Sequence, residues 1–337
     1  MKLGKRSLLG RVGISRFLQL RLNAYLMWML PLTWMQSYIR FWGKIYFFFN
    51  RDENRIIRQN IKLVIGDRKD EQSIQELIQR TFTGIFTHYA EKLFIGYSRL
   101  SRAFKFLRKN ISIEGRDVLD TALAQGKGVI LVTGHYGAVE FLPTFLGLQG
   151  YTLTMLLRFK TKKLKDALNH RIQSAGDVHI TLVDVTQSRS VFFEAIKALK
   201  ARQIVITECD EFEEWRPSKH GNNRFLGRKV PLDRTLDMLQ KRSRSPVVMG
   251  IIQRKSNGRY KLGLHSLDAE SEKKEVPISQ KALAVLEKYI LDAPHQWYQW
   301  KDASHILRTE IGEEPIPVHA PQEDRHLPLE DTPVHAC

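Results

Sequence analysis

From Ile111 onward, short β-branched runs alternate with helical segments, and this alternation constrains the fold more than any other feature. Seven runs predict strands, at Ile111–Glu114, Val129–Thr133, Thr152–Leu157, Val178–Asp184, Ile204–Thr207, Val247–Ile252 and Tyr260–Leu264. The segments between or after them predict helices, at Asp117–Ala124, Val139–Leu148, Lys162–Ser174, Arg189–Leu199, Leu232–Gln240 and Gln280–Leu291. Alternation of this length predicts an α/β fold, a layered αβα domain with a mostly parallel or mixed sheet.

The first hundred residues have a helical pattern instead, and they begin with an aromatic and basic segment. Phe17–Phe49 is strongly apolar, and its longest stretch without a charge, Leu22–Ile39, has 18 residues. A bilayer span usually takes about 20 apolar residues, so this stretch is at the short limit. Three interpretations stay open: a span or hairpin kinked at Pro31, a helix lying in the membrane surface, and a buried core helix of a soluble domain.

Charge is distributed unevenly along the chain, which has 53 Lys and Arg against 36 Asp and Glu, a net charge of +17. Residues 1–70 carry a net charge of +10, whereas residues 308–337 carry −5 and five of the twelve prolines. We therefore expect a membrane-anchoring segment at 1–50, amphipathic helices packed on the main domain at 51–110, the α/β domain at 111–307, and a disordered acidic tail at 308–337.

Composition excludes several classes of protein and cofactor. With 43% hydrophobic residues and few Gly and Pro, the chain is neither disordered nor collagen-like, and it is not a polytopic membrane protein. Two cysteines, Cys209 and Cys337, cannot form a disulfide framework. No zinc spacing and no Walker or Rossmann glycine loop is present, so we expect no metal and no cofactor. The basic excess fits an anionic membrane surface or acidic substrates better than nucleic acid, because no nucleic-acid-binding signature accompanies it.

The segment Gly126–Phe141 carries the chemistry. A buried strand is followed by a tight turn at Gly134 and Gly137 and then by a helix, which is where α/β folds place ligands. His135 and Glu140 are five residues apart, about 500° on an ideal helix, so they can meet only if His135 lies in the turn. Six of the eleven histidines have an acid five positions on, so the spacing alone is weak. Only His135 has the strand and the glycine turn around it.

The types of residue in this turn predict general-base catalysis. A neutral imidazole at His135 can take a proton from an acceptor hydroxyl, and the carboxylate of Glu140 on its other nitrogen would fix the tautomer. The activated hydroxyl could then attack an acyl thioester, with backbone N–H groups at the helix start stabilising the oxyanion. The alternative interpretation is a solvated turn histidine beside a surface glutamate.

The passage TGHYGAVE, residues 133–140, resembles the HX4[DE] motif of lysophospholipid-acyltransferase-like enzymes. It is most similar to the branch of late acyltransferases of bacterial lipid A biosynthesis, and the resemblance runs from about Met29 to Trp300. Further stretches carry it: NRIIRQNIKLV with Asn60, the strand approach Gly126–Ile130, and the closing Pro294–Trp297.

The resemblance implies roles for four more residues. Arg158 and Arg171 match arginines expected to hold phosphate or carrier groups, and guanidinium groups suit bidentate phosphate contacts. Asp210 matches the second acid of the family's Asp-x-Asp, and Glu208 stands where the first would be. Both acids follow the strand Ile204–Thr207, at the carboxyl edge of the sheet where His135 should also lie. We expect all four to bind substrate.

The resemblance also implies an activity. It predicts an O-acyltransferase that moves a fatty acyl chain from acyl carrier protein or acyl-CoA to a hydroxyl of a lipid or glycolipid similar to a lipid A precursor. The expected partners are that donor, a phosphorylated acceptor and an anionic membrane surface, at the cytoplasmic face of a bacterial inner membrane. The alternatives are acylation of a phosphatidylinositol mannoside or a lysophospholipid, or a non-catalytic basic protein that binds membranes or nucleic acid.

Overall fold

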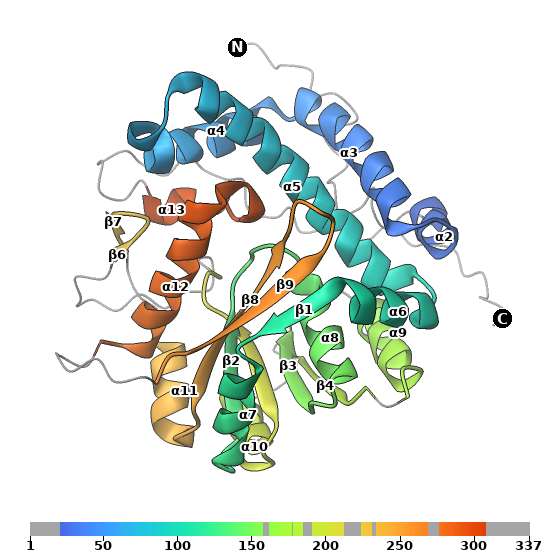
Figure 1. Ribbon diagram of the computed structural model, residues 1–337, viewed down its shortest axis with the longest axis vertical. Coiled ribbons are helices and arrows are strands. Elements are labelled where there is room, and N and C mark those ends of the chain that lie inside the picture. Colours follow the sequence, from blue (N-terminus) through green and yellow to red (C-terminus); the bar gives the residue numbers. More distant parts are fainter. Residues whose placement is uncertain are drawn as a thin grey trace.

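The computed structural model describes residues 21–157, 162–176, 178–184, 191–211, 224–230, 234–268 and 276–307. Its centre is a seven-stranded sheet in the order β1-β9-β8-β2-β5-β3-β4 (Figure 1). The strands are β1 (Ile111–Glu114), β2 (Val129–Thr133), β3 (Leu153–Leu157), β4 (Ile180–Asp184), β5 (Ile204–Glu208), β8 (Val247–Arg254) and β9 (Tyr260–Ser266). Among the described strands of this sheet, only β8 and β9 are paired antiparallel. Each predicted strand is confirmed to within two residues, and so is the mostly parallel sheet.

The middle strand β2 is buried along its whole length. Its residues Val129–Val132 are fully inaccessible, as expected for a strand of a parallel sheet covered on both faces. Neighbouring β5 runs in the same direction, and the register pairs Thr133 with Glu208 at the end of both strands. The residues that follow the two strands therefore emerge side by side at one edge of the sheet.

Helices follow most strands in the order that the sequence pattern predicts. They are α7 (Arg116–Ala124), η3 (Val139–Phe141), α8 (Leu142–Leu148), α9 (Lys162–Gln173), α10 (Val191–Lys200), α11 (Thr235–Ser243), α12 (Ile278–Asp292), η4 (Pro294–Gln296) and α13 (Ser304–Leu307). The predicted helix Val139–Leu148 divides into the 3-10 turn η3 and the short helix α8. Helix α12 packs on β2 and β8, and α10 packs on β3 and β5. A two-stranded ribbon, β6 (Arg224–Phe225) and β7 (Arg228–Lys229), contacts the C-terminal helices.

The N-terminal part is helical, and its longest helix, α5, lies between the sheet and the outer helices (Figure 1). The elements are α2 (Arg21–Met29), α3 (Leu32–Phe49), α4 (Arg51–Ile65), η2 (Gly66–Arg68), α5 (Glu71–Tyr97) and α6 (Leu100–Asn110). The helix breaks before Pro31, as expected for a residue without an N–H group. Across the part of the chain that the structure describes, no helix is both long enough and apolar enough to cross a bilayer. The tail at 308–337 lies outside the described residues.

Candidate active site

His135 lies in a loop that leaves β2 and is held on several sides by backbone hydrogen bonds. The N–H of Gly137 donates to Gln296 O (2.9 Å) and that of Ala138 to Ile252 O (3.0 Å). Gly137 has a φ of 59°, and a Cβ there would come within 1.8 Å of the carbonyl oxygen of Ile252. Only glycine fits this approach, so the residue type at 137 determines where the imidazole of His135 sits.

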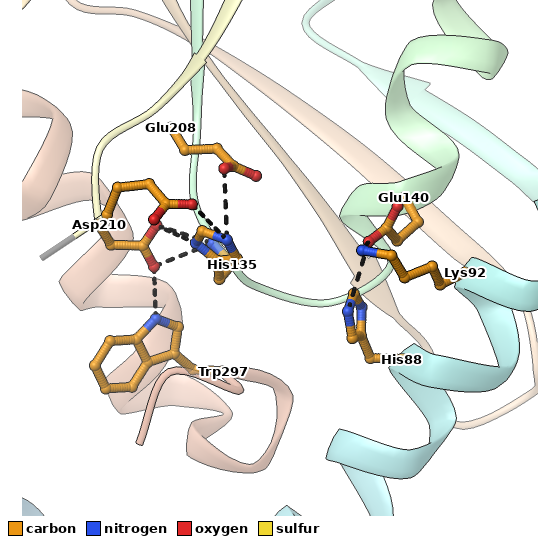
Figure 2. A network of polar contacts seen from close by, with 8 residues as sticks. His88, Lys92, His135, Glu140, Glu208, Asp210 and Trp297 are labelled. Carbon is orange, nitrogen blue, oxygen red and sulfur yellow. Dashed lines mark hydrogen bonds and ion pairs between the residues drawn. The ribbon is translucent and has the colours of Figure 1, made fainter. Parts of the chain in front are cut away.

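The carboxylate beside His135 belongs to Asp210. Nδ1 of His135 lies 2.9 Å from Asp210 Oδ1, and the backbone N–H of His135 donates to the same carboxylate at 3.0 Å. The indole N–H of Trp297 donates to Asp210 Oδ2 at 2.8 Å (Figure 2). Asp210 is fully buried, whereas the side chain of His135 keeps 15% of its surface exposed. The register of β2 and β5 explains the contact, because each of the two residues follows its strand by two positions.

The other ring nitrogen of His135 faces two partly exposed glutamates. Nε2 lies 3.4 Å from Glu208 Oε2 and 3.2 Å from Glu211 Oε1. The imidazole is thus held at Nδ1 by a buried acid and directed at Nε2 toward a polar, partly open region. A ring held in this way has one nitrogen fixed as a donor and the other free to exchange a proton with a bound group.

Electrostatics in this cluster change the protonation of two groups. Burial by itself lowers the pKa of His135, but the carboxylates of Glu208 and Asp210, with hydrogen bonds to Asp210 and Glu211, outweigh it and raise the pKa well above its ordinary value. Burial raises the pKa of Glu208 to about 7, with Glu211 and Asp210 adding to the rise and His135 opposing it. Both groups therefore exchange protons near neutral pH or above it.

Glu140 lies elsewhere, and the expected contact between its carboxylate and the imidazole of His135 is wrong. Oε1 of Glu140 is 2.9 Å from Nζ of Lys92 and 3.6 Å from Nε2 of His88, both on α5. Figure 2 shows the loop running between this group and the cluster at His135. The physical reason is that the turn keeps the imidazole of His135 beside β5, whereas η3 directs Glu140 toward α5.

One aromatic ring connects the two polar groups. Tyr298 stacks on His88 with ring centroids 3.8 Å apart and meets His135 edge-on at 5.3 Å. Its backbone N–H also donates to His135 O at 3.2 Å. His88 is buried, and Nδ1 of its ring has no hydrogen-bond partner among the described residues. Tyr298 thus holds the His135 loop from the side of α5.

An ion pair between the partly buried Arg254 and the fully buried Glu91 supports the same loop. Arg254, at the end of β8, makes two hydrogen bonds to Glu91 on α5, at 2.8 and 2.7 Å. The same guanidinium donates to the carbonyl oxygen of Gly137. The side chain of Gln296 joins in by accepting from the N–H of Arg254 at 2.8 Å. Helix α5, strand β8 and the turn η4 are therefore all tied to the loop that carries His135.

Backbone donors in the loop are already in use. The N–H groups of His135, Tyr136, Gly137 and Ala138 donate to Asp210, Gly134, Gln296 and Ile252. These four N–H groups are therefore occupied, and they belong to the loop before η3, so the N–H groups at the start of the helix, where oxyanion stabilisation was expected, are not among them. The loop does have a positively charged group near it, the exposed ammonium of Lys92, which pairs with the carboxylate of Glu140.

The two arginines expected at the site have different outcomes. Arg158 lies outside the described residues. Arg171 is on α9, where its guanidinium donates to Ser98 O at 2.6 Å, and burial lowers its pKa. The structure thus places Arg171 against the C-terminal end of α5, where a backbone carbonyl takes one of its donors, and not within the His135 cluster.

One set of side chains among the described residues has the spacing of a metal site. His135, Glu208 and Glu211 each offer a ligand atom, and these atoms lie within 4.8 Å of one another. The three are the same groups that surround Nε2, and such clusters of accessible carboxylates are common without a metal. Their chemistry is equally suited to binding protons and a substrate hydroxyl.

Sequence reasoning missed several residues that complete the site. They are His88, Glu91, Lys92, Glu211, Arg254, Trp297 and Tyr298. Two of them carried a signal, because Trp297 belongs to the closing stretch PHQW and Glu211 directly follows Asp210. His88, Glu91 and Lys92 carried no such signal, since the sequence of α5 has the pattern of an ordinary amphipathic helix.

Comparison with known proteins gives a match to one family model. A family model described as bacterial lipid A biosynthesis acyltransferase matches residues 11–301. None of the curated proteins gives a significant match. The matched range contains the whole sheet and all the residues around His135, and the family implies acyl transfer from an acyl donor to a lipid acceptor in lipid A biosynthesis. The chain belongs to the family of bacterial lipid A biosynthesis acyltransferases.

Proposed function

We propose that this protein transfers a fatty acyl chain from acyl carrier protein or coenzyme A to a hydroxyl of a phosphorylated glycolipid, with His135 as the general base. One observation carries the proposal: Nδ1 of His135 is held by a buried carboxylate while Nε2 faces a partly open polar region. Membership of an acyltransferase family supports the acyl donor and the lipid acceptor.

The proposed reaction proceeds in two proton transfers. Nε2 of His135 takes the proton of the acceptor hydroxyl as its oxygen attacks the thioester carbonyl, and a tetrahedral intermediate forms. The C–S bond then breaks, the new ester is released, and the imidazolium returns the proton to the leaving thiolate. Asp210 stabilises the imidazolium between these steps and keeps the neutral ring protonated on Nδ1. No further reactant is needed.

The geometry favours a changed assignment of the acidic residues. Asp210 was expected to bind substrate, but it is buried behind His135, so we assign it the orienting role that was expected of Glu140. Glu208 keeps its proposed role in substrate binding, because its partly exposed carboxylate faces Nε2 and can accept a hydrogen bond from the acceptor. Glu140 holds Lys92, whose ammonium group can attract the anionic part of the donor or acceptor.

We place the reaction at the cytoplasmic face of the bacterial inner membrane. Residues 1–307 carry a net charge of +22, which suits acyl carrier protein, a phosphorylated acceptor and anionic lipids as partners. The proposal treats Arg158 and Arg171 differently. Arg158 remains a predicted phosphate contact, whereas one donor of Arg171 is already taken by Ser98.

A paired experiment tests the proposed function. Lipids of a strain that lacks the protein are expected to lose one fatty acyl chain from a phosphorylated glycolipid, which mass spectrometry detects together with the chain length. The purified protein should transfer a radiolabelled acyl group to the deacylated lipid from the strain, and comparison of the carrier-protein and coenzyme A thioesters identifies the donor. An unchanged lipid profile with no transfer from either thioester would favour a non-catalytic basic membrane-binding protein.

The pH dependence of the reaction follows from the raised pKa of His135. His135 must be neutral to act as a base, so kcat/KM, which reports the protonation of the free enzyme, is expected to increase with pH. Because the pKa of His135 is raised, the midpoint of this increase (the acid limb of the pH profile) should lie above pH 6.5. Glu208→Gln removes a negative charge beside Nε2, which lowers the pKa of His135 and moves the limb to lower pH. The exposed Glu114 on β1 gives the matched control, since Glu114→Gln should leave the limb in place. A limb that does not move in Glu208→Gln would contradict this account.

A further inference from the structure

The hydrogen bond from His135 to Asp210 leaves one motion of the imidazole ring open. It fixes Nδ1, which lies 2.9 Å from Asp210 Oδ1. A hydrogen bond keeps most of its strength when it bends by about 30°, so a ring held at one nitrogen can still tilt. Tilting moves Nε2, and a general base must keep its proton-accepting atom within hydrogen-bond reach of the reacting group. A second contact, against the ring itself, would remove this motion.

Tyr298 makes such a contact. Its ring and the imidazole of His135 have centroids 5.3 Å apart and planes at 88°. This is the edge-to-face arrangement that aromatic rings prefer at centroid distances of about 4.5–7 Å. The backbone N–H of Tyr298 also donates to the carbonyl oxygen of His135 at 3.2 Å. Because the preceding residue, Trp297, donates to Asp210, two consecutive residues support the two contacts of the imidazole.

The ring of Tyr298 is held in turn by His88 on α5. The two rings are stacked, with centroids 3.8 Å apart and planes at 18°. Only 6% of the side-chain surface of His88 is exposed, so its own ring is enclosed by the surrounding core. Enclosed side chains keep single rotamers, because the packed interior leaves no room for others. The stack therefore transmits the position of α5 to the ring of His135.

The surroundings of His88 indicate packing as its role, not proton transfer. Nδ1 is buried and has no hydrogen-bond partner among the described residues. Nε2 lies 3.6 Å from Glu140 Oε1, which is longer than a hydrogen bond. Burial, followed by the positive charge of Lys92, lowers the pKa of His88 well below its ordinary value, so the ring is neutral. A neutral planar ring is suited to stacking on a phenol ring, and phenylalanine could supply the same plane.

We propose that Tyr298, supported by His88, is a positioning residue for the base: it fixes the plane of the His135 imidazole, so that Nε2 points at the acceptor hydroxyl. This rests on the proposed function, in which Nε2 takes the proton of that hydroxyl. It adds a contact on the ring to the one that Asp210 makes at Nδ1. Tyr298 acts through His135 and exchanges no proton itself, so its ring is required and its phenol hydroxyl is dispensable.

Two substitutions separate the ring of Tyr298 from its hydroxyl. Tyr298→Leu removes the aromatic plane and should lower kcat about 10- to 100-fold with KM within about twofold, as expected for a misplaced base. Tyr298→Phe keeps the plane and should retain kcat within about threefold of the parent. Tyr151→Leu removes a partly buried ring bonded to Asp120, away from His135, and as the matched control it should have parental kinetics.

His88 gives the same test from the other ring of the stack. His88→Phe should keep most of the activity, because it retains an aromatic plane beneath Tyr298. His88→Ala removes that plane and should lower kcat in the same direction as Tyr298→Leu, so the test remains if Tyr298→Leu does not fold. Chemical denaturation of each variant measures the free energy of unfolding and identifies those that are folded under assay conditions.

An NMR measurement tests the inference without acyl transfer. In protein with isotope-labelled histidine, the proton on Nδ1 of His135 exchanges with solvent when its hydrogen bond to Asp210 opens. Tyr298→Leu should accelerate this exchange at least about tenfold, whereas Tyr298→Phe should exchange near the parental rate.

Two outcomes would overturn the inference. If Tyr298→Phe loses as much kcat as Tyr298→Leu, the hydroxyl takes part in the chemistry and the residue is not a positioning residue. If Tyr298→Leu keeps the parental kcat and the parental exchange at Nδ1, the bond to Asp210 alone fixes the ring of His135. A parent that transfers no acyl group would refute the proposed function, and the exchange rates would still decide whether Tyr298 positions His135.

Discussion

Replacing Asp210 by asparagine is expected to lower kcat by about 10³- to 10⁴-fold, with a much smaller change in KM. The carboxylate receives N–H donors on both oxygens, from His135 on one side and from Trp297 on the other. An amide has only one acceptor oxygen, so its NH2 group must face one of these donors. If it faces Nδ1 of His135, it forces the proton onto Nε2, which is the wrong tautomer for a general base.

Glu140→Gln is the matched control, because it makes the same acid-to-amide change at the acid of the HX4E spacing. Its carboxylate contacts Lys92 and His88, so kcat should decrease by less than about tenfold. His135→Ala should lose at least as much activity as Asp210→Asn, and the double variant should lose little more, because the two residues act as a unit. Steady-state kinetics measures these losses, on variants whose circular dichroism spectra match that of the parent protein. A larger loss in Glu140→Gln than in Asp210→Asn would return the orienting role to Glu140.

Glu91→Ala is expected to destabilise the fold by about 3–5 kcal/mol. Glu91 is fully buried on α5 and forms a two-point ion pair with Arg254, so its removal leaves the guanidinium of Arg254, whose side chain is only 15% exposed, without its counter-charge. Chemical denaturation measures the free energy of unfolding. Glu71→Ala, which breaks the exposed pair with Lys62, is the surface control and should change stability little.

The double variant Glu91→Leu, Arg254→Met separates stability from positioning. Replacing both charges by apolar residues of similar size should recover most of the lost stability. Activity should stay low, because the carbonyl oxygen of Gly137 also loses its hydrogen bond from Arg254 and the loop that carries His135 loses a support. A misplacement of about 1 Å can cost about 100-fold in rate. Full activity in this variant would show that the ion pair serves stability alone.

The strands and helices of the α/β domain were predictable because each carries a local signal. A buried parallel strand reads as a continuous β-branched run, and β2, Val129–Thr133, matches its prediction at both ends. The turn at Gly134 and Gly137 was predictable for the same reason, since glycine marks a tight turn after a strand. Such signals depend on neighbours in the chain and need no knowledge of the tertiary structure.

The partner of His135 was predictable only in part. The sequence pattern placed Glu208 and Asp210 at the same edge of the sheet as His135, because parallel strands end at one edge. It did not state which acid would reach Nδ1. The five-residue spacing to Glu140 favoured the nearer residue in the chain, whereas the register that pairs Thr133 with Glu208 brings the distant Asp210 into contact.

The sequence by itself determined the α/β class, the place of His135 after a buried strand, the basic and aromatic N-terminal segment, and the family. These properties follow from periodicity, charge and local motifs, each contained in a short stretch of chain. Only the tertiary structure showed that the carboxylate of Asp210 contacts the ring of His135, that the carboxylate of Glu140 pairs with Lys92, and that one aromatic face of α3 is exposed. Contacts between residues far apart in the chain depend on strand register and helix packing, which no local pattern specifies.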